Sequence, residues 1–266
     1  MSPVRSRIGS RHATQLLLLH LQLRLEVGST NVDNNTVLVI TAHPDDVDFG
    51  AGGTVAAWSA SGVEVSYCVV TDGDAGGFDP EVPRTKIGPI RRAEQTAAAK
   101  ILGVKKVIFL GYPDGRLTPS IELRRDISRV IRQVKPARVL CQSPERNYRR
   151  IYASHPDHLA AGEAALCAVY PDARNQFAHP ELAAEGLDAH TVEEVWLMGS
   201  ENPDTFVDIS ATLEAKVAAL REHVSQRTDE DGRLEERIRA WAAEQARAAG
   251  RDDATLVEGF RRVGTA

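Results

Sequence analysis

The chain has 266 residues, of which 42% are hydrophobic and 26% are charged, a composition typical of a globular protein that can bury a full core. It carries 37 acidic and 32 basic residues, and the resulting net charge of −5 gives no general attraction to nucleic acid or to anionic membranes. We therefore expect no nucleic-acid partner.

The beginning of the chain differs from the rest. Basic residues precede the apolar stretch LLLLHLQLRL (residues 16–25), which superficially resembles a secretion signal. The stretch is interrupted by a histidine, a glutamine and an arginine, no small-residue cleavage site follows it, and it is shorter than the roughly 20 apolar residues of a membrane span. We predict that residues 1–35 are an N-terminal extension outside the core, with no membrane span. Residues 36–266 are predicted to form a single domain that ends in a helical segment.

Three widely spaced cysteines, Cys68, Cys141 and Cys167, form no CxxC pair. Two of them lie in apolar runs, where a thiol behaves as a small buried hydrophobic group. This pattern is typical of a reducing compartment and predicts a cytoplasmic protein without a disulfide framework.

From residue 36 onward, predicted strands alternate with predicted helices. Short runs rich in β-branched residues predict strands, and longer runs with helical periodicity follow them. The predicted strands are 36–42, 63–71, 105–111, 137–143 and 193–199, and the predicted helices are 52–62, 90–103, 123–136 and 157–170. A short strand at 206–210 and helices at 211–225 and 229–249 complete the pattern. It predicts an α/β fold with a mostly parallel sheet that carries helices on both faces.

Polar segments follow four successive predicted strands. They are HPDD (43–46), TDGDAGG (71–77), GYPDG (111–115) and SPERNYRRIYASHPDH (143–158). In open parallel sheets, ligands bind outside the carboxyl ends of the strands. We therefore expect the chemistry of this protein at that edge of the sheet.

Two of these segments contain candidate metal ligands. Pro44 ends the first strand, so that His43 and Asp46 lie three residues apart across a turn and can reach the same ion. The later HPDH motif adds His155 and His158. Two histidines and one carboxylate with an open fourth position are typical of a catalytic zinc site, and the same ligands also suit iron(II).

Each motif alone is a weak signal. An HxxD sequence occurs in ordinary turns, and HPDH could be a helix start that is capped by Asp157 or Ser154. The metal interpretation gains weight because both motifs lie at the ends of predicted parallel strands.

The remaining groups in these motifs suit hydrolysis. Zinc lowers the pKa of a bound water to about 7 and polarises a carbonyl, but a base must still take a proton and an acid must protonate the departing amine. If Asp46 binds the metal, the adjacent Asp45 is free to be the base. If His158 is the second histidine ligand, His155 is left to stabilise the oxyanion or to protonate the amine.

Other charged residues beside these motifs are candidates for substrate contacts. Asp72 could orient His43 or hydrogen-bond a hydroxyl group of a substrate. Arg146, Arg149 and Arg150 could bind an anionic aglycone or lie on a solvated face. The sequence leaves these alternatives open.

The motifs, in this order, resemble those of the PIG-L/LmbE-like N-deacetylases. The matching stretches are AHPDDVDFGAGG, VVTDGDAG, IRRAEQTAAAKILGV, FLGYPDGRL, HPDHLAAG and a late group formed by Asp208, Lys216, His223, Ser225 and Gln226. The resemblance covers residues 37–226. It implies a zinc-dependent hydrolase on a Rossmann-like fold that removes the acetyl group from an N-acetylglucosaminyl conjugate or cleaves a related amide.

The resemblance assigns roles residue by residue. It implies that His43, Asp46 and His158 bind the metal. It makes Asp45 the general base and His155 the acid or the oxyanion partner.

It also implies a sugar pocket. Arg91 or Arg92, together with Glu94, matches an R-x-x-E helix start, and the spacing favours Arg91. Asp114 matches an acidic position after the third strand. With Asp72 added, these residues form the predicted substrate-binding set.

One departure from the family pattern bears on the substrate. Many members read HPDDE, whereas Val47 follows the aspartates here and the next acid is Asp48, as in the subgroup that resembles the bacillithiol-pathway deacetylases. The mycothiol-pathway deacetylase and conjugate amidase are more similar to the HPDDE group. The identity of the aglycone therefore stays open.

Together these features predict a cytoplasmic metallohydrolase that uses Zn2+, or alternatively Fe2+, and a metal-activated hydroxide to deacetylate an amino-sugar conjugate. The alternatives are an amidase that cleaves a mycothiol-like thiol conjugate and a sugar-binding protein that keeps the fold without catalysis. The intact Asp45 and His155 argue against a binding protein, which needs neither a base nor an acid beside its metal. The sequence leaves open whether the protein forms a homo-oligomer.

Overall fold

A computed structural model describes residues 35–265 except 149–150, 152–153, 228 and 253–254. The predicted N-terminal extension lies outside the described residues, apart from Asn35. Within the described residues, no helix is both long enough and apolar enough to cross a membrane.

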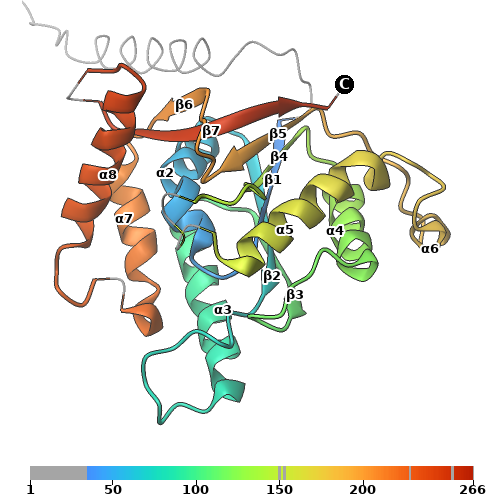
Figure 1. Cartoon of the computed structure of the whole chain (residues 1–266), viewed down its shortest axis with the longest axis horizontal. Coiled ribbons are helices and arrows are strands. Elements are labelled where there is room, and N and C mark those ends of the chain that lie inside the picture. Colours follow the sequence, from blue (N-terminus) through green and yellow to red (C-terminus); the bar gives the residue numbers. More distant parts are fainter. Residues whose placement is uncertain (1–34, 149–150, 152–153, 228, 253–254, 266) are drawn as a thin grey trace, which may run out of the picture. The chain divides into compact units, whose positions relative to one another are not determined.

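The centre of the fold is a seven-stranded sheet with the strand order β3-β2-β1-β4-β5-β7-β6 (Figure 1). The strands are β1 (Thr36–Thr41), β2 (Glu64–Thr71), β3 (Lys106–Tyr112), β4 (Arg138–Gln142), β5 (Glu194–Met198), β6 (Thr205–Asp208) and β7 (Val257–Gly264). The first five pair in parallel, whereas β7 runs antiparallel to both β5 and β6. The predicted fold class, an α/β fold with a mostly parallel sheet, is confirmed.

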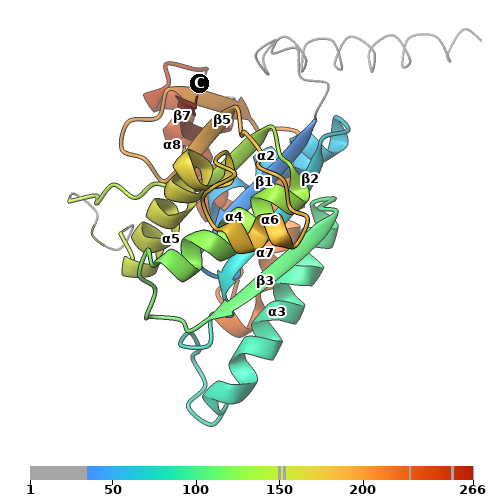
Figure 2. The same cartoon turned by 90° about the vertical axis from the view of Figure 1, so that its right-hand side faces the viewer.

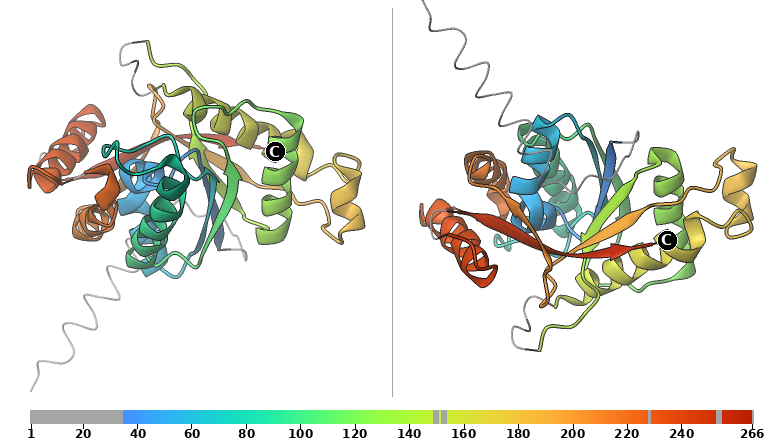
Figure 3. Two further views of the ribbon diagram at one scale, coloured as in Figure 1. Left: turned by 90° about the horizontal axis from the view of Figure 1, so that it is seen from below. Right: turned by 90° about the horizontal axis from the view of Figure 1, so that it is seen from above.

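Helices cover both faces of this sheet, as the two views in Figure 3 show. They are α2 (Asp46–Ala60), α3 (Arg84–Ile101), α4 (Ile121–Val134), α5 (Pro156–Cys167), α6 (Pro180–Ala184), α7 (Leu213–Arg221) and α8 (Leu234–Ala248), with a π-helical turn η2 (Ala168–Ala173) and a 3-10 turn η3 (Val224–Gln226). The helices α2, α3 and α7 cover one face, and α4 and α5 cover the other. β3 forms one edge of the sheet and lies beside α3 in Figure 2.

Strand β1 shows why the sheet needs both layers. Leu38 and Ile40 pack into the core beneath α4 and α5, whereas Val37 and Val39 pack into the core beneath α2 and α3. Successive side chains of a strand point to opposite faces, so a continuous apolar run requires cover on both sides. The run VLVI therefore places β1 at the middle of the fold and its carboxyl end at the centre of the sheet edge.

The structure differs from the predicted elements at several places, since α3 begins at Arg84 rather than at residue 90 and the short helix α6 was not predicted. Two other differences bear on the site and on the sheet. Helix α2 begins at Asp46, inside the motif expected to be a loop, and Asp46 and Asp48 lie in its first turn, where carboxylates complement the helix dipole. Strand β7 was not predicted, because it is held by β5 and β6, whose hydrogen-bonding edges cannot be recognised in the local pattern of residues 257–264.

Candidate metal centre and active site

The four polar segments predicted to meet at one sheet edge do meet there. Ala75, which follows β2, donates its N–H to Asp114 Oδ2, which follows β3, over 3.0 Å. Ala42, after β1, donates its N–H to Gln142 Oε1 at the end of β4, over 2.9 Å. Gly115, after β3, donates to Asp157 Oδ2 in the first turn of α5, over 2.7 Å. These hydrogen bonds connect the segments that follow the parallel strands, so that their polar groups lie together at one edge of the sheet.

Three potential metal donors lie close together at this edge of the sheet. His43 Nδ1 lies 3.2 Å from His158 Nε2 and 3.4 Å from Asp46 Oδ2, and His158 Nε2 lies 2.9 Å from Asp46 Oδ1. Zinc bonds to such atoms are about 2.0–2.2 Å long, and tetrahedral angles then separate the donors by about 3.3 Å. The two nitrogens and one carboxylate therefore have the spacing that a tetrahedral divalent ion needs.

The carboxylate of Asp46 is fixed in this position by its neighbours. Its Oδ2 accepts hydrogen bonds from the N–H of His43, over 2.7 Å, and from Gln142 Nε2, over 2.9 Å. Burial favours the neutral carboxyl, but His158 and His43 outweigh it and hold the pKa of Asp46 well below its usual range. Gln142 was not predicted as a site residue, and the sequence gives no signal for it.

Two further carboxylates lie on the other side of the His43 ring. His43 Nε2 is 3.0 Å from Asp114 Oδ1 and 3.4 Å from Asp157 Oδ2, and all three side chains are nearly inaccessible to solvent. A carboxylate beside one ring nitrogen keeps the proton there and leaves the other nitrogen free to bind a metal. Asp157 was weighed in the sequence as a helix cap, but the cap of α5 is His155, whose Nδ1 accepts from the N–H of Asp157.

The charges around His43 also suit a cation. Burial opposes its charged form, but Asp46, Asp114 and Asp157 outweigh that effect and raise the pKa of His43 to about 12. The donor atoms of His43, His155 and His158 lie within 4.8 Å of one another, as do those of His43, Asp114 and Asp157. Because several buried carboxylates face one another here, a bound divalent cation would compensate their charge.

Asp45 stands next to the donors in an unusual backbone conformation. Its φ of 87° lies in the left-handed region, which non-glycine residues seldom adopt. Arg91 Nη2 donates to Asp45 Oδ2 over 3.0 Å and to the carbonyl of Pro44 over 2.6 Å. Burial raises the pKa of Asp45 to about 6, against the opposing effect of Arg91. The side chain of Asp45 is 17% exposed, so a substrate can reach its carboxylate, and the charges of Asp46 and His43 both act on its pKa.

His155 flanks the donors on another side. Its ring centroid is 4.9 Å from that of His43 and 5.2 Å from that of His158. Burial, together with His43 and His158, lowers the pKa of His155 and favours its neutral form. Because Nδ1 accepts the hydrogen bond from Asp157, the proton of this neutral ring lies on Nε2, which can donate to a ligand.

The residues predicted to bind substrate surround this centre but already contact protein groups. Arg91 is 4% exposed and also donates to the carbonyl of Gly73. Glu94 accepts hydrogen bonds from the N–H and the hydroxyl of Ser225, and Asp72 pairs with Arg92. Asp114 contacts His43 as described above. Their roles toward a substrate stay predictions, as do those of Arg149 and Arg150, which lie outside the described residues.

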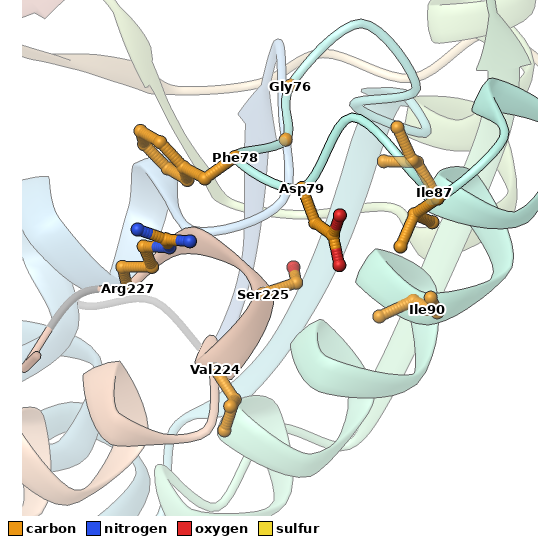
Figure 4. A pocket seen from close by; sticks show the side chains of 10 residues that line it. Gly76, Phe78, Asp79, Ile87, Ile90, Val224, Ser225 and Arg227 are labelled. Carbon is orange, nitrogen blue, oxygen red and sulfur yellow. The ribbon is translucent and has the colours of Figure 1, made fainter.

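An open apolar hollow of about 250 Å³ lies near the loop after β2 (Figure 4). Phe78 and Arg227 border one side and Ile87 and Ile90 the other, and the Arg227 guanidinium lies 5.5 Å from the centroid of the Phe78 ring. The remaining lining residues are Gly76, Gly77, Asp79, Val82, Val224 and Ser225. The loop that carries Gly76 thus touches both the hollow and Arg91, whose Nη1 bonds the carbonyl of Gly73.

Comparison with known proteins shows which family the chain resembles. Residues 38–169 match the family described as PIG-L: GlcNAc-PI de-N-acetylase. The chain is 39% identical over 194 residues to the diacetylchitobiose deacetylase of Thermococcus kodakarensis, an alignment that covers 73% of this chain and 71% of that protein. It is 32% identical over 199 residues to a protein of Bacillus anthracis named "Probable N-acetyl-alpha-D-glucosaminyl L-malate deacetylase 2", covering 71% and 80% of the two chains.

A solved structure shows the same similarity in three dimensions. The N,N'-diacetylchitobiose deacetylase from Pyrococcus horikoshii, solved in complex with its inhibitor MPG, superposes with a TM-score of 0.81 at 31% identity and covers 98% of this chain and 95% of that one. The family, the fold and the deacetylase class predicted from the sequence are thereby confirmed. The chain belongs to the PIG-L family of de-N-acetylases.

Proposed function

We propose that this protein removes the N-acetyl group from an N-acetylglucosamine-type conjugate in a metal-dependent hydrolysis. The observation that carries the proposal is the convergence of His43 Nδ1, His158 Nε2 and the Asp46 carboxylate within 2.9–3.4 Å of one another. The deacetylases of diacetylchitobiose and of N-acetylglucosaminyl malate among its relatives support an amino-sugar substrate.

His43, Asp46 and His158 are the residues that would hold the metal. Two imidazole nitrogens and one carboxylate oxygen suit Zn2+, and Fe2+ accepts the same donors. When bound, such an ion would polarise the acetamide carbonyl and lower the pKa of a coordinated water. Asp114 and Asp157 would keep the proton of His43 on Nε2, so that Nδ1 faces the ion.

Two residues of the chain would move protons. Asp45, anchored by Arg91, would take the proton of the attacking water at its free carboxylate oxygen. His155, with its proton on Nε2, would donate a hydrogen bond to the developing oxyanion or transfer a proton to the departing nitrogen. Both residues adjoin the donors, since Asp45 precedes Asp46 in the chain and the ring centroid of His155 lies 4.9 Å from that of His43.

We also propose that residues at the same edge of the sheet line the sugar pocket. Arg91, Asp114, Asp72 and Glu94 lie on the segments that surround the donors. We further propose that residues 36–266 form one catalytic domain and that the enzyme works in the cytoplasm, where the described cysteines, all free thiols, would stay reduced.

Acetate release provides the test. Purified protein would be incubated with N,N'-diacetylchitobiose and with N-acetylglucosaminyl malate, with and without a chelator, while its metal content is measured on the same sample. We expect chelator-sensitive release of one acetate per deacetylated sugar. A bulky thiol-conjugate amide serves as the comparison substrate. Cleavage of that amide without acetate release would favour the amidase, and binding of the sugars without any product would contradict a catalytic role.

A further inference from the structure

A chain of buried polar side chains lies behind Asp45. The N–H of Asp45 donates to Gln95 Oε1 over 2.8 Å, and Gln95 Nε2 donates to Asp48 Oδ2 over 2.8 Å. The same carboxylate oxygen lies 2.8 Å from His223 Nε2. Gln95, Asp48 and His223 are each 0% exposed, although they come from α3, from α2 and from the segment after α7.

One end of this chain of contacts bonds the backbone of Asp45, whose conformation is energetically unfavourable. Asp45 has a φ of 87°, and a non-glycine residue in this region costs on the order of 1–3 kcal/mol, so the conformation persists only where the surroundings fix it. The carbonyl of Asp45 accepts from the N–H of Phe49 over 3.0 Å, and Arg91 holds the preceding carbonyl and the carboxylate. Gln95 holds the remaining polar group of the residue, its N–H.

The side-chain amide of Gln95 can bond both Asp45 and Asp48 in only one of its two flipped orientations. An ionised carboxylate only accepts hydrogen bonds, so the amide nitrogen must face Asp48 and the amide oxygen must face the N–H of Asp45. His223, on the other side of Asp48, is in a position to donate to the same oxygen and limits the freedom of that carboxylate. The buried pair of Asp48 and His223 therefore determines that the amide oxygen of Gln95, and not its nitrogen, faces Asp45.

We propose that Gln95 is a positioning residue of the deacetylation reaction: it holds the Asp45 peptide in its left-handed conformation, and the buried Asp48–His223 pair orients Gln95 for this role. The inference rests on the proposed function only in calling Asp45 the base. A displaced Asp45 carboxylate would slow the proton transfer and leave the metal donors in place, because those donors are held by other bonds.

The first test replaces Gln95 by methionine, which has nearly the same volume but cannot make either hydrogen bond. For Gln95→Met we expect kcat to fall on the order of 10- to 100-fold, as for other residues that orient a catalytic group, with KM and metal content unchanged. Gln245→Met is the matched control. Gln245 also accepts from a backbone N–H, that of Gly259 over 2.9 Å, but it lies on α8 away from the donors, and its loss should leave kcat unchanged.

Two backgrounds separate positioning from a general structural role. In an Asp45→Asn enzyme, where the base is already lost, Gln95→Met should reduce the residual rate little, because residues that act through one group are not additive. An equal fold-loss in both backgrounds, or a loss of metal, would show a structural role instead and overturn the proposal. The wild-type enzyme is assayed alongside, so an inactive wild type would count against the proposed function and not against this inference.

A charge-swapped pair provides a second variant and a rescue. Gln95→Glu alone should be slow, because its carboxylate faces Asp48. The double variant Asp48→Asn/Gln95→Glu pairs donors with acceptors again. The carboxylate of residue 95 accepts from the N–H of Asp45 and from the amide nitrogen of residue 48. The same nitrogen donates to His223 Nε2, when the proton of that ring is on Nδ1. We expect this double variant to recover most of the lost kcat. A double variant that folds but is as slow as Gln95→Glu would contradict the proposed hydrogen bonds.

A readout independent of turnover is the backbone itself. A crystal structure of Gln95→Met, or of Gln95→Glu if the first variant does not fold, should show Asp45 with a φ outside the left-handed region or in several conformations. An unchanged φ near 87° would overturn the proposal whatever the activity.

Discussion

Asp114 Oδ1 lies 3.0 Å from His43 Nε2, on the side of the ring opposite to Nδ1, which faces His158 and Asp46. His43 is thus held between a carboxylate and the predicted metal donors. We therefore expect Asp114 to have a second role beside the predicted substrate contact, because an amide in its place would hold the proton on Nε2 less well than a carboxylate.

Replacing Asp114 by asparagine should therefore weaken metal binding on the order of 10- to 100-fold. Competition with a chelator of known affinity measures the change. Asp126→Asn is the control, since Asp126 lies on α4, accepts from the hydroxyl of Tyr112 and is not among the predicted metal donors or their neighbours. Equal metal affinity of Asp114→Asn and the wild type would assign Asp114 to the substrate alone.

Asp45→Asn should keep the metal and lose on the order of 10² to 10⁴ in kcat, because an amide cannot accept a proton at this step. The hydrogen bond with Arg91 can be kept by the amide oxygen, so little change in stability is expected. The measurement is acetate release together with elemental analysis. Near-normal turnover would remove Asp45 from the proton transfer.

His158→Ala should lose the metal, because it removes one of three donors that lie within 2.9–3.4 Å of one another. Elemental analysis after dialysis tests this. His190→Ala is the control, since His190 Nε2 is bonded to the carbonyl of Pro136 and takes no part in the donor set. A fully occupied His158→Ala protein would mean that another histidine is the ligand.

His155→Asn should keep both the metal and the stability but lower kcat. Asparagine is a good helix cap, so its side chain can replace Nδ1 of His155 as the acceptor at the start of α5. It cannot replace the imidazole as a proton donor. Thermal unfolding, metal content and kcat are measured on one preparation. If metal is lost while the fold is kept, His155 would belong to the donor set and not to the proton transfer.

Lys216→Met should destabilise the protein by about 3–5 kcal/mol, because it leaves the carboxylate of Glu258 buried without its partner. Lys216 Nζ lies 2.5 Å from Glu258 Oε1, and both side chains are 1% exposed. Denaturant unfolding measures the loss. The exposed pair of Arg233 and Glu236 is the control, and Arg233→Met should show no measurable change. A small effect at Lys216 would mean that water or the N–H groups of Gly53 and Thr54 satisfy Glu258 without it.

Much of the fold could be predicted because the strands are continuous apolar runs. VLVI in β1 and VSYCVVT in β2 are buried on both faces, and such runs are recognisable without knowing their partners. Strand β7 was missed because VEGFRRVG has no such run and becomes a strand only between β5 and β6. The start of α2 was missed because Asp45 and Asp46 are typical of a turn as well as of a helix start.

The sequence by itself determined the family, the alternation of strands and helices, and the short motifs that supply His43, Asp46 and His158. These are local properties, since each depends on residue type and on spacing over a few positions. Only the tertiary structure decided what surrounds them: Asp157 behind His43, Arg91 on Asp45, and Gln95 and His223 behind the Asp45 peptide. The contacts join residues that lie from 46 positions apart, as Asp45 and Arg91 do, to 175 positions apart, as Asp48 and His223 do. Strand order and helix packing, which no local pattern encodes, bring them within hydrogen-bonding distance.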